Sequence, residues 1–179
     1  MKNIRLLNKQ EFHEDKRGKT PAYFFNNTKH ILDNNLIEEL KLISRPERKT
    51  MRICLHDSIT DVLHNMIIID YKDNLNLPHY HLSTSESHHI LEGELGCFHF
   101  NDEGQLINSY VLSKDDKVLD RIGKNIIHLL MPISDCVIYH EANRGSFIRN
   151  EPDMFFPEWF SNMSTSEKEE LFSSLLEKV

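Results

Sequence analysis

From Arg52 to Glu141 the chain alternates short apolar runs with polar turns, a pattern typical of many short β-strands. The turn residues Asn101 to Gly104 indicate a hairpin, because Gly stands last in a polar tetrad. Short strands at even intervals predict an all-β sandwich or barrel with peripheral helices. The expected strands span 52–56, 66–71, 86–92, 96–100, 106–112, 117–122, 125–131 and 136–141.

The two ends of the chain follow different patterns. Residues 1–50 read as an N-terminal α/β lead-in, with strand-like pieces at 4–7 and 22–25, a loop at 10–21, and a helix from Thr28 or Asp33 to Ser44. Ser164 to Glu167 resembles a capping box that opens an amphipathic C-terminal helix. We expect a single domain over 1–179, made of an N-terminal extension (1–50), a barrel (51–150) and a C-terminal segment with a helix (151–179).

Composition narrows the class of protein. The 179 residues are 39% hydrophobic and 27% charged, as in globular proteins. The net charge of −7 argues against a nucleic acid or an anionic membrane as partner. Cys54, Cys97 and Cys136 have no C-x-x-C spacing and read as buried free thiols in a reducing compartment. With no signal peptide or membrane span in the sequence, we expect a cytoplasmic protein.

The strongest chemical signal runs from Pro78 to Gly93. His79 and His81 are separated by one residue, so on a strand both imidazoles share a face with their Cα atoms about 6.6 Å apart. That separation lets two nitrogens converge on one metal ion at about 2.1 Å each. Glu86 opens the next strand and adds a carboxylate. The alternative is chance pairing on an ordinary hairpin, since the chain contains 11 His.

The spacing H-x-H-x4-E-x6-G, formed by His79, His81, Glu86 and Gly93, resembles the first signature motif of the cupin superfamily. This resemblance implies a cupin jelly-roll β-barrel. It also implies a second motif that supplies a further imidazole, for which His128 is the candidate. The segment before His128 lacks the motif's Pro and has a longer gap after Gly123.

Other imidazoles compete for the role of third nitrogen ligand. His88 shares the face of Glu86, and His140 lies on the strand expected at 136–141. His128 itself could be a core histidine bonded to a backbone carbonyl. Four further residues are assigned to the surface by default: Tyr80, His89, Glu92 and His99.

Three His and one Glu suit one divalent transition metal (Fe, Mn, Zn, Ni or Cu). Several short blocks between residues 48 and 160, among them Arg52 to His56 and Pro78 to His81, resemble cupin-fold metalloproteins of the WbuC type. Genes of that type often accompany bacterial surface-polysaccharide genes. The resemblance implies a metal-binding protein for polysaccharide (O-antigen or lipopolysaccharide) biosynthesis that acts on, or binds, a sugar or sugar nucleotide.

Whether the chain is an enzyme stays open at the sequence level. It could be a metal-dependent sugar isomerase, epimerase or oxygenase with Glu86 and Tyr139 as catalytic candidates, or a non-catalytic sugar-binding or regulatory module with a structural metal. The substrate-binding candidates are Tyr139, Glu141 and Arg144, placed near the end of the last barrel strand, and His88. The expected apolar lining is Ile90, Ile126, Leu130 and Ile138. Exposed apolar strands and the C-terminal helix favour a homodimer.

Overall fold

The computed structural model describes residues 4–18, 20–146 and 152–179 of the chain. A 3-10 turn, η1 (Arg5–Leu7), is followed by two strands and a helix, β1 (Phe12–Asp15), β2 (Ala22–Phe25) and α1 (Asn34–Ser44). The strands of the central part are β3 (Met51–Cys54), β4 (Leu63–Tyr71), β5 (Tyr80–His81), β6 (Glu86–Glu92), β7 (Leu95–Phe100), β8 (Leu106–Leu112), β9 (Leu119–Ile122), β10 (Ile127–Pro132) and β11 (Cys136–Arg144). The chain ends with β12 (Met154–Phe155), α2 (Glu158–Ser161) and α3 (Thr165–Leu176).

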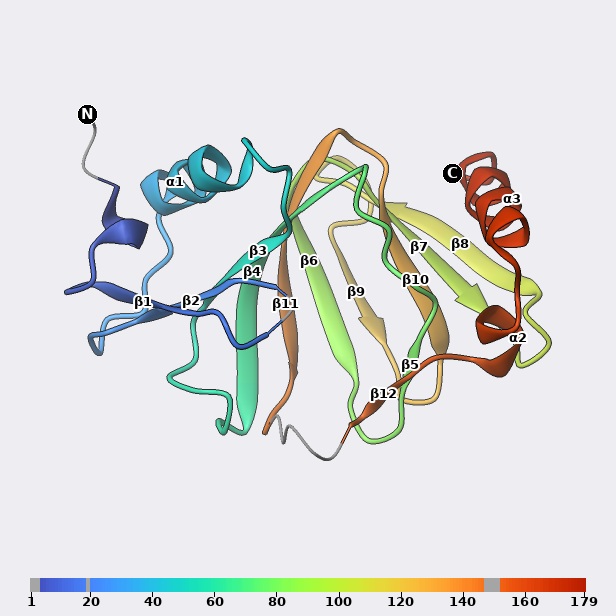
Figure 1. The fold of residues 1–179 in the computed structure, drawn as a ribbon, viewed down its shortest axis with the longest axis horizontal. Coiled ribbons are helices and arrows are strands. Elements are labelled where there is room, and N and C mark those ends of the chain that lie inside the picture. The colour runs from blue at the N-terminus through green and yellow to red at the C-terminus, as the bar shows by residue number, and fades with distance from the viewer. Residues whose placement is uncertain (1–3, 19, 147–151) are drawn as a thin grey trace.

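The strands form a sandwich of two sheets, as expected for a jelly roll. One sheet has seven strands in the order β1-β2-β3-β4-β11-β6-β9, and the other contains β10-β7-β8. A bridge between His79 and His128 attaches the short β5–β12 pair to the β10 edge of the second sheet. Figure 1 shows the two sheets facing each other, with α1 beside one and α3 beside the other. The prediction of an all-β jelly roll with peripheral helices is confirmed.

Strand alternation divides the buried side chains into three groups. Every second residue of β3, β4, β11 and β6 faces the other sheet and fills the sandwich interior, including Cys54, Ile68, Tyr139 and Ile90. The alternate residues of the same strands pack outward against η1, β1, β2 and α1. On the opposite side, the outer face of β7 and β10 is covered by α3 and Trp159. The inward positions of these strands therefore line the space between the two sheets.

The N-terminal region packs on the seven-stranded sheet. The helix was expected to begin at Thr28 or Asp33, and α1 begins at Asn34 with Asp33 as its N-cap, accepting a hydrogen bond from the Leu36 backbone. Two expectations were wrong. Residues 5–7 form a 3-10 turn and no strand, and the expected loop at 10–21 contains β1, which is stabilised by pairing with β2. Tertiary pairing overrides the polar composition of that segment.

The C-terminal helix has the expected start. Ser164 caps α3 and Glu167 completes the capping box. Leu175 is buried against the sheet of the same chain, with Leu171 and Phe172 packed beside it, whereas Leu176 stays exposed. In the part of the chain that the structure describes, no helix is both long and apolar enough to cross a membrane. All three cysteines are free thiols. The expected homodimer stays a prediction.

Candidate metal centre

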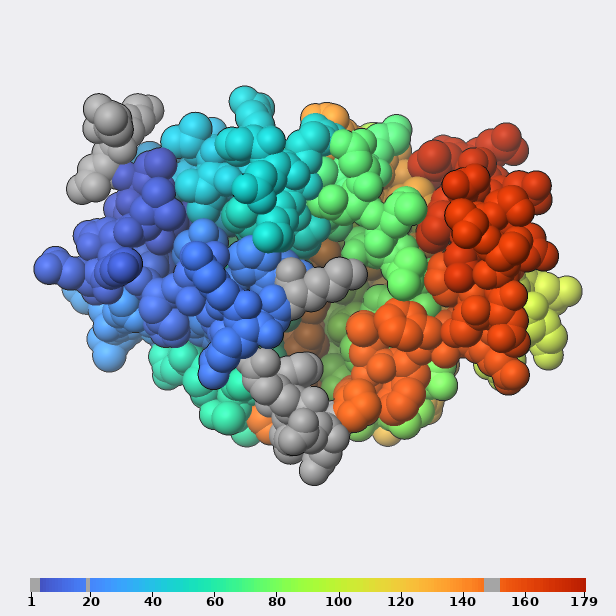
Figure 2. Space-filling view, viewed as in Figure 1, coloured from blue at the N-terminus to red at the C-terminus, as the bar shows by residue number. Residues whose placement is uncertain are grey.

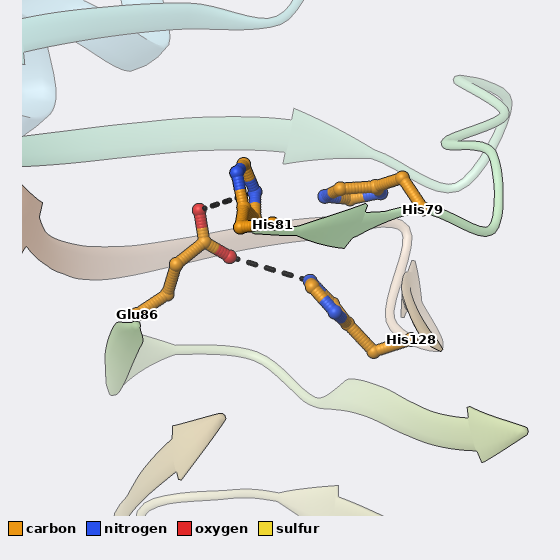
Figure 3. Close-up of side chains that lie close together, drawn as sticks. All are labelled: His79, His81, Glu86 and His128. Carbon is orange, nitrogen blue, oxygen red and sulfur yellow. Dashed lines mark ion pairs between the residues drawn. The ribbon is translucent and has the colours of Figure 1, made fainter. Parts of the chain in front are cut away.

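Four side chains from three strand segments meet at one end of the sandwich interior. His79 precedes β5 and His81 ends it, Glu86 opens β6, and His128 is the second residue of β10. The backbones of His79 and His128 exchange two hydrogen bonds, N to O, of 2.9 and 2.8 Å. This bridge brings the second-motif strand beside the first. Figure 3 shows the three imidazoles and the carboxylate turned toward one another.

Two of the imidazoles are held so that Nε2 faces the centre. Nδ1 of His79 donates to the Leu77 carbonyl at 2.8 Å, and Nδ1 of His128 donates to the Ile126 carbonyl at 2.9 Å. A histidine that ligates a metal usually donates its other ring N–H to such a fixed acceptor. Nε2 of His128 and Nε2 of His81 are buried, and the nearest acceptors to them are the carboxylate oxygens of Glu86. A metal ion at the centre would satisfy these nitrogens and the carboxylate together.

Glu86 provides the negative charge of the centre. Its Oε1 lies 3.0 Å from Nε2 of His81 and its Oε2 lies 3.3 Å from Nε2 of His128, marked by dashed lines in Figure 3. Burial would raise the pKa of the Glu86 carboxyl, but the imidazoles of His128 and His81 outweigh burial and hold that pKa well below its usual range. Glu86 is therefore an anion at neutral pH, the form that binds metals.

The pKa values of His79 and His81 shift in opposite directions. Burial, helped by His128, lowers the pKa of His79 to about 4, so His79 is neutral at pH 7. Burial also acts on His81, but Glu86 and Asp153 raise its pKa above the ordinary value. A neutral imidazole can bind a metal directly, and a protonated one must first release its proton.

The donor set fits one divalent first-row metal ion. One ligand atom from each of the four residues lies within 4.8 Å of the other three. Donors bonded to one ion at about 2.1 Å lie at most about 4.2 Å apart, so the cluster needs a contraction of roughly half an ångström. Three nitrogens and one carboxylate oxygen can bind such a metal, and this chemistry does not choose among Fe, Mn, Zn, Ni and Cu.

His88 lies next to the centre on the same face of β6. Its side chain is fully buried, and Nδ1 is held at 3.0 Å from Oδ1 of Asp120. Oδ2 of Asp120 in turn accepts a 2.7 Å hydrogen bond from Tyr110. Nε2 of His88 has no hydrogen-bond partner and lies 3.8 Å from Oε2 of Glu86. The structure thus places His88 beside the four clustered residues, with its ring orientation fixed by Asp120.

The substrate-binding candidates on β11 separate into two faces. Tyr139 is buried in the interior and its ring lies 6.0 Å from that of His88. Glu141 shares that face, opposite His88 in the β6 register, and accepts a 2.9 Å hydrogen bond from Asn143. Arg144 is exposed and has the opposite parity. Tyr139 is the fourth residue of a nine-residue strand, so its placement near the strand end was wrong.

Four other placements also differ from the sequence expectations. His140 does not line the barrel, because it has the outward parity of Ile138 and lies 3.1 Å from Oδ1 of Asn65. Ile138 itself belongs to the outer cluster under α1. Ile126 is 36% exposed because β10 begins one residue later. His99 was assigned to the surface, yet it pairs with His128 across β7 and β10 and lies half-buried beside Tyr110.

Sequence reasoning missed three charged groups around the site. Asp153 lies 3.5 Å from Nδ1 of His81 and accepts hydrogen bonds from Ser83, so it can orient that ring. It follows residues 147–151, outside the described part, and no pattern marked it. Arg52 does carry a signal, since it is a charged residue in the otherwise apolar strand β3, whereas Asp120 stands beside Arg121 in β9 and carries none.

Three comparisons with known proteins were informative to different degrees: a family model matches part of the chain, and solved structures share its fold. A family described as "Domain of unknown function (DUF6016)" matches residues 32–112. A search of curated proteins finds no match. Among solved structures, CapF, a capsular polysaccharide assembling protein from Staphylococcus aureus, aligns with a TM-score of 0.52 and 17% identity over 62% of this chain and 30% of that chain.

A second CapF structure, with the inhibitor 3-isopropenyl-tropolone, aligns with the same TM-score of 0.52 and the same 17% identity. L-ribose isomerase from Cellulomonas parahominis aligns with a TM-score of 0.47 and 15% identity over 56% of this chain and 60% of that chain. The chain spans about a third of the length of the CapF chains it matches. At 17% identity the likeness to CapF shows the fold alone, consistent with the jelly-roll sandwich described above.

Proposed function

We propose that the chain is a cupin-fold metal-binding protein in which His79, His81, Glu86 and His128 hold one divalent transition metal. The observation that carries the proposal is the convergence of the four donors within 4.8 Å, with the buried Nε2 atoms of His81 and His128 both facing the Glu86 carboxylate. Ligation satisfies those nitrogens and neutralises part of the buried Glu86 charge. In His79 and His128 a backbone carbonyl holds Nδ1, which leaves Nε2 as the nitrogen available to a metal ion.

The ligand of this site, in our proposal, is a small polar molecule rich in oxygen, such as a sugar or sugar nucleotide. A bound divalent metal would polarise a hydroxyl or carbonyl oxygen or activate dioxygen. Tyr139 and Glu141 turn polar groups into the same interior, between apolar side chains such as Ile90 and Leu130. Apolar walls lower the local dielectric and strengthen polar contacts with the ligand.

His88 is the residue best placed to move a proton. Asp120 holds Nδ1, and the free Nε2 lies beside Glu86 in the interior. Burial opposes the charged imidazole, but Asp120 and Glu141 raise the pKa of His88 above its ordinary value. An isomerase or epimerase needs such a group to take and return a proton on carbon. Glu86 and Tyr139 stay our further catalytic candidates.

A place in bacterial surface-polysaccharide biosynthesis is the biological role that we propose. It is supported by the sequence blocks that resemble WbuC-type proteins and by the fold shared with CapF, whose name describes capsular polysaccharide assembly. A rival function is a non-catalytic sugar-binding module. It is favoured by the number of protein donors, because structural zinc sites are closed by four protein ligands, whereas catalytic ones keep a position open.

One experiment tests the metal and the ligand together. Elemental analysis of the purified protein should find one transition metal per chain. Calorimetry would then titrate UDP-glucose and pyruvate into metal-loaded and metal-stripped protein. Heat that requires the metal and weakens in Tyr139→Phe supports the ligand site. Equal heats from both forms would show that the metal is structural, and absence of metal after reconstitution would refute the metal centre.

A further inference from the structure

Arg52 lies on the interior side of β3, across the seven-stranded sheet from the metal centre. Cys54, two residues further along β3, belongs to the interior cluster, and strand alternation places Arg52 on the same face. Its register partner on β4 is Ile68, which is also an interior residue. A guanidinium therefore enters a part of the sandwich lined mostly by apolar side chains.

The charge of Arg52 has no counter-ion in the described part of the chain. Its Nε is buried without a hydrogen-bond partner, and Nη1 donates to Sδ of Met66 at 3.5 Å. Within the described residues no carboxylate oxygen lies within 4.0 Å of Arg52, whereas Arg5 and Arg48 each contact two carboxylates. A half-buried cation of this kind is unfavourable unless an anion compensates it.

The positive charge of Arg52 affects the pKa values of two candidate ligand-binding residues, Tyr139 and Glu141. Burial raises the pKa of the Tyr139 hydroxyl and of the Glu141 carboxyl, and the positive charge of Arg52 opposes the rise in both. Tyr139 lies one strand from Ile68, and Glu141 lies directly opposite His88. Arg52, Glu141 and His88 thus line one continuous surface of the sheet.

The distance between Arg52 and the metal centre fits a small molecule. β3 and β6 are three strand spacings apart in the sheet, since β4 and β11 lie between them. At about 4.8 Å per spacing, their backbones are roughly 14 Å apart across the strands. The register places Arg52 level with Ile90, four residues from Glu86, which adds about 13 Å along the strands, so the backbones of Arg52 and Glu86 are roughly 20 Å apart. The long side chain of Arg52 covers part of that distance. Figure 2 shows the face hollowed between the N-terminal strands and residues 152–157, with β11 at the bottom of the hollow.

We propose that Arg52 binds the oxyanion of the ligand, a carboxylate or a phosphate, while the ligand's hydroxyl or carbonyl oxygens lie at the metal centre. The inference rests on the proposed function for the metal end and adds a substrate class, an acidic or phosphorylated sugar or a small hydroxy acid. The planar guanidinium suits this role because it binds both oxyanions through two parallel hydrogen bonds.

The test reads the Arg52 side chain directly by NMR. The Nε–H signal of Arg52 is assigned by its loss in Arg52→Gln, and inorganic phosphate and acetate are titrated separately into metal-free protein. We expect the signal to shift in a saturable way with at least one anion below about 50 mM, the range of weak single-group contacts. The anion that binds more tightly distinguishes a phosphorylated ligand from a carboxylic acid.

Variants measure the contribution of the guanidinium. Arg52→Gln should weaken binding of the preferred anion more than tenfold, because a charged two-point contact is replaced by a neutral amide. Arg52→Lys keeps the charge but loses the planar guanidinium, so its affinity for the anion should lie between those of the wild type and Arg52→Gln. Arg45→Gln, which changes an exposed arginine at the end of α1, should bind the anion as the wild type does.

Two results would overturn the inference. One is an Arg52 Nε–H signal that moves with neither anion in the wild-type protein. If Arg52→Gln does not fold, the loss of the signal in Arg52→Lys assigns it. The other is a folded Arg52→Gln that binds the anion as tightly as the wild type. The anion titration uses metal-free protein, and the metal content is measured separately. Each experiment can therefore refute its own proposal, the anion site or the metal centre, without deciding the other.

Discussion

Replacing His128 tests whether the second motif supplies a metal ligand. His128→Gln keeps a polar side chain of similar reach but removes the buried Nε2 that faces Glu86. His140→Gln is the matched control, because His140 lies on β11, the next strand along the chain, with its side chain on the outer face of the seven-stranded sheet. The two histidines were rival candidates for the third imidazole, so the pair of variants separates them.

The expected effect follows from linkage between metal binding and folding. At a free metal concentration of 100 times Kd, binding stabilises the folded state by about 2.7 kcal/mol. For a chain of this length, 1 kcal/mol changes Tm by about 2–4 °C, so the metal should raise Tm by roughly 5–11 °C. Structural sites gain about 10–16 kcal/mol from four ligands, or roughly 3 kcal/mol each, so losing one should weaken binding about 100-fold.

The assay compares Tm with and without metal at one fixed metal concentration, together with elemental analysis. His128→Gln should retain a rise of only about 1–2 °C, since the metal is then near its Kd. His140→Gln should show the wild-type rise. A wild-type response in His128→Gln, or a lost response in His140→Gln alone, would refute the ligand assignment.

Three further predictions concern the surroundings of the centre. Asp153→Asn should lower metal affinity about 10- to 100-fold, because it weakens the group beside Nδ1 of His81, and competition with a chromogenic chelator measures this. In metal-free folded protein the pKa of His79 is lowered to about 4, from about 6.5 in the unfolded chain. As the pH falls below 7, His79 therefore binds a proton in the unfolded chain before it does so in the folded protein, which favours unfolding. His79 should therefore cost about 2 kcal/mol of stability between pH 7 and pH 5, a loss absent in His79→Gln by urea unfolding. Gly93→Ala should destabilise by at least about 2 kcal/mol, because φ is +78° and a Cβ would lie 2.5 Å from the Cys136 carbonyl oxygen; an unchanged unfolding midpoint would contradict this.

Local sequence patterns predicted where the strands lie better than they predicted which side chains point into the sandwich. The strand expected at 106–112 is β8 as observed, because a turn ending in Gly fixes its start. The inward set of β11 was misjudged, since its residues are apolar on both faces: Ile138 packs under α1 and Tyr139 fills the interior. A strand buried on both sides carries no alternation, so periodicity alone cannot tell which face is inward.

The site could be predicted only where its residues are close in sequence. His79, His81 and Glu86 follow from spacing, because a strand and a short turn determine their geometry. His128 needed the motif resemblance, since it meets the others through a bridge between residues 49 positions apart. The roles of Arg52 and Asp120 depend on register between strands, which the sequence does not specify.

Residues 4–45 belong, in our proposal, to the same domain as the barrel. Their apolar side chains, such as Phe12, Leu36 and Leu40, form one cluster with Ile53 and Ile69 of the sheet. Without this cover, the outer face of β3, β4 and β11 would expose a row of large apolar residues. The match of a family model to residues 32–112 also crosses the boundary expected at residue 50.

The four metal-donor residues come from strands on both sides of the sandwich. Glu86 opens β6 of the seven-stranded sheet and His128 lies on β10 of the other sheet, whereas His79 and His81 lie on the β5 segment that a bridge attaches to β10. One ion bound by these residues would thus connect the two sheets at this end of the sandwich. At the opposite side of the interior, Arg52 carries a positive charge with no carboxylate in contact among the described residues, and its Nε has no hydrogen-bond partner. Polar groups buried between these two points are unfavourable for folding, and in our proposal a bound ligand accounts for them.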